Sequence, residues 1–296
     1  MNCSKTSKGM TRPRSLFGDN TDLRTISLGA GVQSTALYLM ALDGLIGPMP
    51  DVAIFADTQQ EPPWVYENVW RLAAEGGDRI PIIIATGGDI GEAVRRKAGA
   101  SEGRFASVPF WVMSESEARP TPGRRQCTRE FKIDVVKQEV RRQLGLGFRQ
   151  RATGMHVEEW VGVSMDEVIR AKPSRTPWIK TRWPFLMDHP MRRQQIKEWL
   201  AARGWPEIKK SACIFCPYRK PVEYARWRDE EPALFEEACQ WDELIRDSSR
   251  AGLRQPQYLT RLLKPLRELP SVAELGKRDD AQLDLFGNEC EGMCGV

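Results

Sequence analysis

The stretch ISLGAGVQSTALYLMAL, residues 26–42, changes its pattern in the middle. The residues before Gly29 are apolar and β-branched, which predicts a buried strand over 23–28. Residues 34–46 have the composition of a helix, and the turn Gly29-Ala30-Gly31 joins the two. A strand, a glycine-rich turn and a helix N-terminus together favour an anion, because backbone N–H groups and the helix dipole point at it. The alternative is a tight turn that only packs the helix on a sheet.

The alternation of strand and helix continues along the chain. Further strands are predicted over 52–58 and 80–86, and helices over 62–75 and 89–99. Short apolar runs separated by helices indicate βαβ units on a parallel sheet that is covered on both faces. The expected fold class is therefore α/β, a Rossmann-like parallel sheet with flanking helices. Such sheets bind ligands at the carboxyl ends of their strands, which here are Gly29–Gly31, Asp57-Thr58 and 86–88.

The rest of the chain is less regular. Residues 100–127 are expected to be an irregular loop, 128–145 a helix capped by Thr128, and 160–164 a strand. Four prolines predict a long basic connection before a helix over 191–203, namely Pro173, Pro177, Pro184 and Pro190. Helices then follow to about residue 267. We therefore divide the chain into a disordered arm (1–20), an α/β nucleotide-binding domain (21–205) and a helical C-terminal region (206–296).

Size and charge limit the function classes. The chain has 296 residues and a net charge of +4, which suits one large domain or two small ones. No apolar run reaches the roughly 18–20 residues that span a bilayer, and residues 1–15 lack the apolar core of a secretory signal. A cytoplasmic protein without a membrane partner is expected. The charge fits either a mildly basic soluble protein or one that binds a nucleotide or nucleic acid.

The seven cysteines are expected to carry chemistry rather than disulfides, because the cytoplasm is reducing. Cys213 and Cys216 form a CxxC turn, a spacing shared by zinc, iron–sulfur and redox sites. Cys127 stands among the basic residues Arg124, Arg125, Arg129 and Lys132. Cys290 and Cys294 lie in the last seven residues, where they are either reactive thiols or part of a frayed terminus.

A second basic group interleaves with aromatic residues. It comprises Arg170, Lys172, Arg175, Lys180 and Arg182, with Trp160, Trp178, Trp183 and Trp205 along the same region. Arginine forks suit phosphate or sulfate, and aromatic side chains among basic ones can stack the bases of single-stranded nucleic acid. The simpler interpretation is a solvated face beside core tryptophans. Neither His156 nor His189 is paired with a nucleophile, so histidine acid–base catalysis is not expected.

Two motifs carry a resemblance to a known family. Gly29–Ser34, GAGVQS, resembles the loop of the PP-loop ATP pyrophosphatases, with Gly29 in place of a Ser and Gln33 in place of an Asp. The phosphoadenylylsulfate (PAPS) reductases have a similarly altered loop, and FADT, 55–58, is also similar to the superfamily. Cys127, the CxxC and the Glu289-Cys290 tail follow in the order found in adenylylsulfate (APS) reductases. The chain is most similar to phage and bacterial PAPS-reductase-like proteins.

This resemblance implies the adenine nucleotide alpha-hydrolase fold and a set of site residues. It implies a nucleotide site made by Gly29, Ala30, Gly31, Gln33, Ser34, Asp57, Thr58, Arg125, Arg129, Lys132, Gly162 and Arg170. It also implies a [4Fe–4S] cluster held by Cys127, Cys213 and Cys216, one ligand fewer than the family because Thr128 replaces a cysteine; zinc is the alternative metal. Cys290 would attack the sulfur of PAPS or APS, with Cys294 as resolving thiol and a thioredoxin-like reductant.

Two other functions remain open at this point. One is a PP-loop sulfur transferase that uses ATP with Mg²⁺ to thiolate tRNA or modify DNA. Its count of three cluster cysteines would match Cys127, Cys213 and Cys216, whereas the missing Asp at Gln33 counts against it. The other is a zinc-stabilised nucleotide-binding module with no turnover.

Overall fold

A parallel sheet forms the centre of the molecule and confirms the predicted α/β class. The computed structural model describes residues 20–99, 107–114, 116, 118–147, 149–246 and 255–279. Within these residues five parallel strands pair in the order β3-β2-β1-β6-β7. Their bounds are Leu23–Leu28 for β1, Val52–Asp57 for β2, Ile82–Thr86 for β3, Val157–Trp160 for β6 and Ile179–Arg182 for β7.

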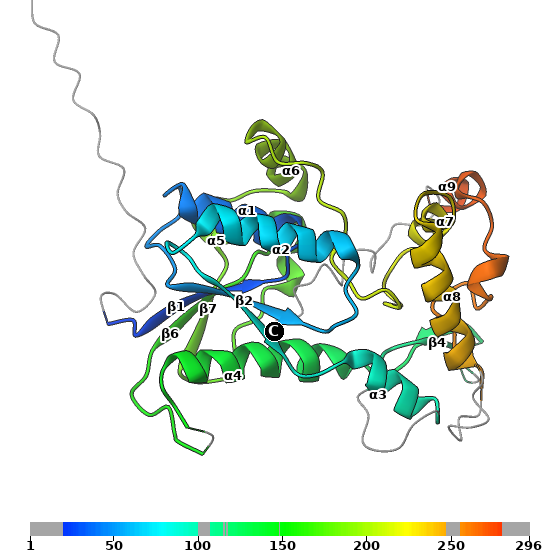
Figure 1. Cartoon of the computed structure of the whole chain (residues 1–296), viewed down its shortest axis with the longest axis horizontal. Coiled ribbons are helices and arrows are strands. Elements are labelled where there is room, and N and C mark those ends of the chain that lie inside the picture. The colour runs from blue at the N-terminus through cyan, green and yellow to red at the C-terminus, as the bar shows by residue number, and fades with distance from the viewer. Residues whose placement is uncertain are drawn as a thin grey trace, which may run out of the picture.

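Helices cover one face of the sheet completely. α1 (Val32–Leu42), α2 (Pro63–Gly76), α5 (Pro184–Met187) and α6 (Arg193–Ala202) lie on this face (Figure 1). α1 is enclosed between the sheet and its neighbours α2 and α6, so every one of its residues is buried. This explains why the sequence of α1 is apolar on all sides instead of amphipathic.

The opposite face is covered only in part. α4 (Asp134–Gln143) crosses it and packs Val135, Val136 and Val140 against β2 and β3 (Figure 1). The half of this face that belongs to β1, β6 and β7 has polar side chains and borders a cleft. The cleft is the subject of the next subsection.

A second hydrophobic core joins the C-terminal helices to the sheet domain. α7 (Pro221–Glu230), α8 (Pro232–Arg246), the 3₁₀ turn η3 (Leu266–Glu268) and α9 (Val272–Asp279) lie to the right in Figure 1, with α3 (Ile90–Lys97) below them. Phe215 lies between the two cysteines of the CxxC turn, and its ring packs between Phe110 and the α8 residue Trp241. The CxxC turn is therefore built into this core.

The prediction of a long connection in the proline-rich segment before residue 191 is wrong, because this segment contains regular structure. A 3₁₀ helix, η2, covers Met165–Arg170, and β7 lies between Pro177 and Pro184. The prolines flank β7 without interrupting it, and Pro184 occupies the first turn of α5, where its missing N–H costs nothing. The strand predicted over 160–164 is also misplaced, since β6 ends at Trp160.

The segment around Cys127 also differs from prediction. Residues 127 and 128 are already helical and lead into a π-helical turn, η1 (Arg129–Ile133), before α4. Thr128 has helical backbone angles and makes no side-chain cap; its hydroxyl instead accepts a hydrogen bond from Arg125 at 2.8 Å. Part of the predicted irregular loop is a hairpin of β4 (Trp111–Met113) and β5 (Pro120–Pro122).

A buried arginine fastens β7 to β6. Arg182 is 2% exposed, and its guanidinium donates to Glu158 at 3.1 Å and to Asp188 at 2.9 Å. The same guanidinium lies 4.7 Å from the ring centre of Trp160, whose indole N–H also donates to Glu158. The sequence analysis assigned Arg182 to a basic surface group, but it is a core residue.

Several expectations lie outside the described residues. These are the disordered arm up to residue 19 and the tail thiols of Cys290 and Cys294. Of the helices in the described ranges, none is long and apolar enough to cross a membrane.

Candidate functional site

The strand order creates a place for a ligand. The chain leaves β1 toward β2 on one side, and β6 pairs with β1 on the other side. In open parallel sheets, ligands bind at such a switch point, outside the carboxyl ends of the strands. A cleft of about 660 Å³ lies here, bordered by Ser27–Gly29 of β1 and by Glu159 of β6. That volume is in the range of small-molecule sites.

The walls of this cleft are basic. One wall is η1 and α4 with the residues just before them, and the other is the segment that follows η2. The basic residues that line the cleft are Arg125, Arg129, Lys132, Lys137, Arg170, Lys172 and Arg175. The acidic residues that line it are Asp134, which pairs with Arg129 at 3.6 Å, and Glu159. The cleft therefore attracts an anion.

The glycine loop lies at the β1 end of the cleft. Gly29 lines the cleft, Ala30 has a positive φ of 56°, and Gly31 is the N-cap of α1. Ala30 is held there because its carbonyl accepts a hydrogen bond from the Asn68 amide at 2.8 Å. Gly31 makes no side-chain cap, and Gly29 is the loop residue that lines the cleft.

Gln33 belongs to a buried network. Its amide donates to Glu167 at 3.0 Å, and its carbonyl accepts from Arg193 at 3.2 Å. Glu167 also accepts from Arg170 at 2.8 Å, which connects the cleft wall to the loop helix. Burial raises the pKa of Glu167, although Arg170 and Arg193 oppose that shift. Gln33 thus connects the first turn of α1 to Arg170 on the cleft wall through Glu167.

Gly162 and Ser34 support the loop. A Cβ placed on Gly162 would lie 3.0 Å from the backbone carbon of Gln33 and 3.1 Å from the nitrogen of Ser34. A side chain at Gly162, two residues after β6, would therefore press on the backbone of the first turn of α1. The Ser34 hydroxyl is buried and donates to the Gly31 carbonyl at 3.4 Å. Both residues therefore shape the loop from behind, away from the cleft.

Asp57 and Thr58 are not part of the cleft lining. The Asp57 carboxylate accepts hydrogen bonds from the Gln59 backbone and the Tyr66 hydroxyl, both at 2.8 Å. Thr58 is fully buried, and its hydroxyl lies 3.2 Å from the sulfur of Cys213. The structure thus places Asp57 at the end of β2, bonded to the turn that follows, and Thr58 beside Cys213.

The three cysteines of the predicted metal site line one small pocket. Cys127, Cys213 and Cys216 surround a cavity of about 30 Å³, roughly the volume that one water molecule occupies in the liquid. The pocket adjoins the basic cleft, because Arg125, Thr128 and Lys132 line both. A ligand in the cleft would therefore have thiols beside it.

Cys213 is buried beside an ion pair. Its sulfur lies 3.9 Å from a Glu61 oxygen, and Lys132 pairs with the same carboxylate at 3.0 Å. Burial, with help from Glu61, raises the pKa of the Cys213 thiol well above its usual value. Without a metal this cysteine is a neutral thiol. Metal binding there would release a proton.

The chemical type of the three side chains suits a soft metal. Three cysteine sulfurs are the ligands that iron–sulfur clusters and zinc select. As the side chains stand, no three His, Cys, Asp or Glu groups among the described residues converge closely enough to hold an ion. Loading would therefore require the thiols to turn into an enlarged cavity.

Hydrogen bonds connect the segment that contains the CxxC turn to the glycine loop and to the residues that follow β2. The Ser211 hydroxyl donates to the Gly29 carbonyl at 2.5 Å, and the Ile214 amide donates to the Gln60 carbonyl at 2.8 Å. These bonds span about 150 residues or more of sequence. The thiol pocket and the glycine loop consequently hold a fixed relation to each other.

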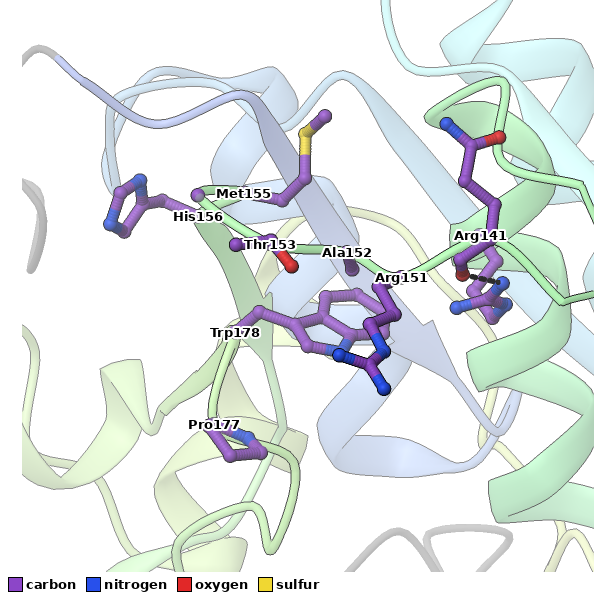
Figure 2. Close-up of a pocket in the computed structure, with 10 residues that line it drawn as sticks. Arg141, Arg151, Ala152, Thr153, Met155, His156, Pro177 and Trp178 are labelled. Carbon is purple, nitrogen blue, oxygen red and sulfur yellow. Dashed lines mark hydrogen bonds between the residues drawn. The ribbon is translucent and has the colours of Figure 1, made fainter.

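A second hollow lies at the other end of the sheet. It has a volume of about 620 Å³ and is formed by the loops that precede β6 and β7. Figure 2 shows Trp178 and Pro177 from one loop and Arg151 to His156 from the other. Arg141 borders it, but its guanidinium is already engaged by the carbonyls of Gly147 and Gln150. Because ligands of parallel sheets bind at the carboxyl ends, the cleft is the better candidate.

Two residues of the cleft were not predicted from the sequence, namely Lys137 on its wall and Glu159 on its floor. Lys172 and Arg175, which the sequence placed only in the second basic group, also line the cleft. Lys137 follows Ile133 by four residues, about one helical turn beyond the basic residues of η1. Helical spacing would therefore have placed Lys137 on the same wall of the cleft. Glu159 has no comparable signal, because only the strand register puts it in the cleft.

Comparisons with solved structures give distant matches, one of which is described here. The crystal structure of phosphoadenylyl-sulfate (PAPS) reductase from Candida auris, a phosphate complex, matches with a TM-score of 0.39 and 16% identity. The match covers 63% of this chain and 75% of the other. No family model matches the sequence, and no curated protein matches it. The structural likeness is too low to support an argument, so the site is interpreted from its own geometry.

Proposed function

We propose that the chain is a sulfonucleotide reductase, an enzyme that reduces the sulfate group of an adenylylsulfate to sulfite. The observation that supports this most is the contact between two sites, since the basic cleft and the thiol pocket share Arg125, Thr128 and Lys132. An anionic nucleotide would bind in the cleft with sulfur chemistry at its side.

The chain's own residues would do the binding. The guanidinium groups of Arg170 and Arg129, on opposite walls of the cleft, would hold the sulfate and phosphate oxygens. The basic walls would stabilise the negative charge that develops on the departing phosphate. Gln33, through Glu167, would keep Arg170 in position.

The proposed reaction begins with the Cys290 thiolate. It attacks the sulfur, the bond between sulfur and the phosphate oxygen breaks, and the adenosine phosphate leaves with the electron pair. The enzyme is left with a thiosulfonate on Cys290. The thiol of Cys294 or of a thioredoxin-like protein then attacks the Cys290 sulfur, forms a disulfide and releases sulfite. If the partner formed the disulfide, its second thiol releases Cys290 and the partner leaves oxidised; if Cys294 formed it, the two thiols of the partner reduce it.

Cys127, Cys213 and Cys216 would hold the metal centre. An iron–sulfur cluster there would supply a redox-active group next to the substrate. The pocket walls Arg125 and Lys132 would balance the negative charge of the thiolates.

An ATP-dependent sulfur transferase acting on tRNA or DNA is the second candidate. The observation in its favour is that three cysteines, instead of four, line the pocket, which would leave one iron open to sulfide. Against it, Gln33 is held in the Glu167–Arg193 network where the pyrophosphatases have an Asp.

Replacement of the tail thiol tests the proposed reaction. Cys290→Ser should lower sulfite release from APS or PAPS by several orders of magnitude, because no thiolate remains to attack sulfur. Nucleotide affinity and bound metal should stay unchanged. Mass spectrometry of the wild-type protein mixed with substrate, without reductant, should detect the thiosulfonate on Cys290.

Cys294→Ser is the matched control on the same segment. It should slow turnover less, since an external thiol can replace a resolving one. Full activity of Cys290→Ser would refute the reductase mechanism. AMP and pyrophosphate released from ATP, with no sulfite from either sulfonucleotide, would favour the transferase.

A further inference from the structure

The floor of the cleft is polar where a covered sheet is normally apolar. On the face that α4 covers, β2 presents Val52, Ile54 and Ala56, as expected for a strand buried on both faces. On the same face beside it, Glu159 of β6 pairs in register with Thr25 of β1 and Thr181 of β7. A row of polar side chains therefore crosses three strands, and Glu159 and Thr181 border the cleft.

Glu159 has no hydrogen-bond partner among the residues that the structure describes. The nearest charged influence on it is Lys137 of α4, yet burial dominates and raises the pKa of the Glu159 carboxyl to about 7. The Glu159 side chain is partly exposed on the floor of the cleft. A ligand that fills the cleft would displace water from this carboxyl group and would have to supply a hydrogen-bond donor in its place.

The lining of the cleft thus favours a ligand that combines two chemical properties. The basic walls, with Arg129 and Lys132 on one side and Arg170, Lys172 and Arg175 on the other, favour an anionic end. The floor carboxylate favours a hydrogen-bond donor. A nucleotide with free ribose hydroxyls has both, and a carboxylate is the group that dinucleotide-binding sheets use for a ribose hydroxyl. A phosphate on that hydroxyl would meet the carboxylate as a like charge.

We infer that Glu159 binds a ribose hydroxyl, so that the cleft selects a nucleotide whose ribose is unphosphorylated and disfavours its 3′-phosphorylated form. The inference rests on the proposed function and names the substrate within it: adenylylsulfate, in preference to 3′-phosphoadenylylsulfate. Glu159 is then the residue that determines this specificity.

Calorimetric titration with AMP and with adenosine 3′,5′-bisphosphate tests this inference. At pH 8, above the pKa of about 7, the Glu159 carboxyl is ionised. The wild-type protein should bind AMP about 10-fold or more tightly than the bisphosphate, because like charges brought together cost several kcal/mol. Glu159→Gln should reduce that preference to nearly none, mainly by tightening the bisphosphate, since the amide keeps the shape and loses the charge.

Glu198→Gln is the matched control. It removes the same charge from an exposed position on α6, on the other face of the sheet, and should keep the wild-type preference. Equal or tighter binding of the bisphosphate by the wild-type protein would overturn the inference and leave the nucleotide site intact. An unchanged preference in Glu159→Gln would also overturn it. Absence of binding by either nucleotide would refute the proposed function itself. The wild-type comparison decides the question even if Glu159→Gln does not fold.

Discussion

Arg182→Met should lower the free energy of unfolding by about 3–5 kcal/mol, the usual cost of removing one partner from a buried ion pair. The substitution leaves the buried carboxylate of Glu158 and the partly buried one of Asp188 without their cation. It also removes the donor to the Gly47 carbonyl at 3.1 Å and the stacking on Trp160. Because Glu158 lies on β6 and Arg182 on β7, the edge of the sheet beside the cleft should loosen first.

Urea denaturation followed by tryptophan fluorescence measures this loss. Arg267→Met is the matched control, since Arg267 also pairs with two carboxylates, Glu236 and Glu243, but is half exposed on the surface. Exposed ion pairs contribute little, so the control should unfold close to wild type. If Arg182→Met were no more harmful than Arg267→Met, the buried ion pair would not stabilise the β6–β7 edge.

Cys213→Ala should abolish metal binding. Cys213 is one of three thiols that line the pocket, and the two remaining cysteines cannot hold a cluster or a tetrahedral zinc. Protein purified without oxygen should contain iron and sulfide and absorb broadly in the visible range. The variant should lack both signals.

Cys239→Ala is the matched control for this experiment. Cys239 is also buried and unpaired, but it lies in α8 and does not line the pocket, and burial raises its pKa to about 11. Its loss should leave the metal content unchanged. Stoichiometric zinc in the wild type, lost in Cys213→Ala, would identify a zinc site in place of a cluster. Metal retained by Cys213→Ala would exclude the pocket as its site.

Local patterns predicted the first half of the sheet well. The strand predicted over 23–28 is β1, and those over 52–58 and 80–86 agree with β2 and β3 within two residues. These strands are apolar runs between helices, and burial on both faces leaves that signal in the sequence. The helix predicted over 34–46 begins at Val32 and ends at Leu42, since the turn glycine itself is the N-cap.

The second half of the sheet lacks such a signal. β7 has four residues, alternates buried and exposed positions only in part, and contains the buried Arg182. A short segment between prolines that contains an arginine has the composition of a surface connection. The local sequence does not show that Glu158 and Asp188 pair with this arginine in the core. Thr128 failed as a cap for a similar reason, since the helix already starts one residue earlier and Arg125 engages its hydroxyl.

The candidate site also has parts that the local sequence predicts and parts that depend on long-range contacts. The glycine loop and the CxxC turn are local motifs, so the sequence could identify both and leave their function open. Their proximity depends on long-range bonds such as Ser211 to Gly29, which no local pattern records. Glu159 and Glu167 reach their positions through strand register and a buried network, so sequence reasoning did not find them.

Hydrogen–deuterium exchange with and without AMP tests the central claim, that a nucleotide binds in the basic cleft at the switch point. AMP should slow exchange over 129–137 and 169–176, the two walls, and at Gly29 of the glycine loop. Exchange over 150–156 and 177–178, the second hollow, should not change. Protection confined to that second hollow, or no protection in either place, would contradict the account.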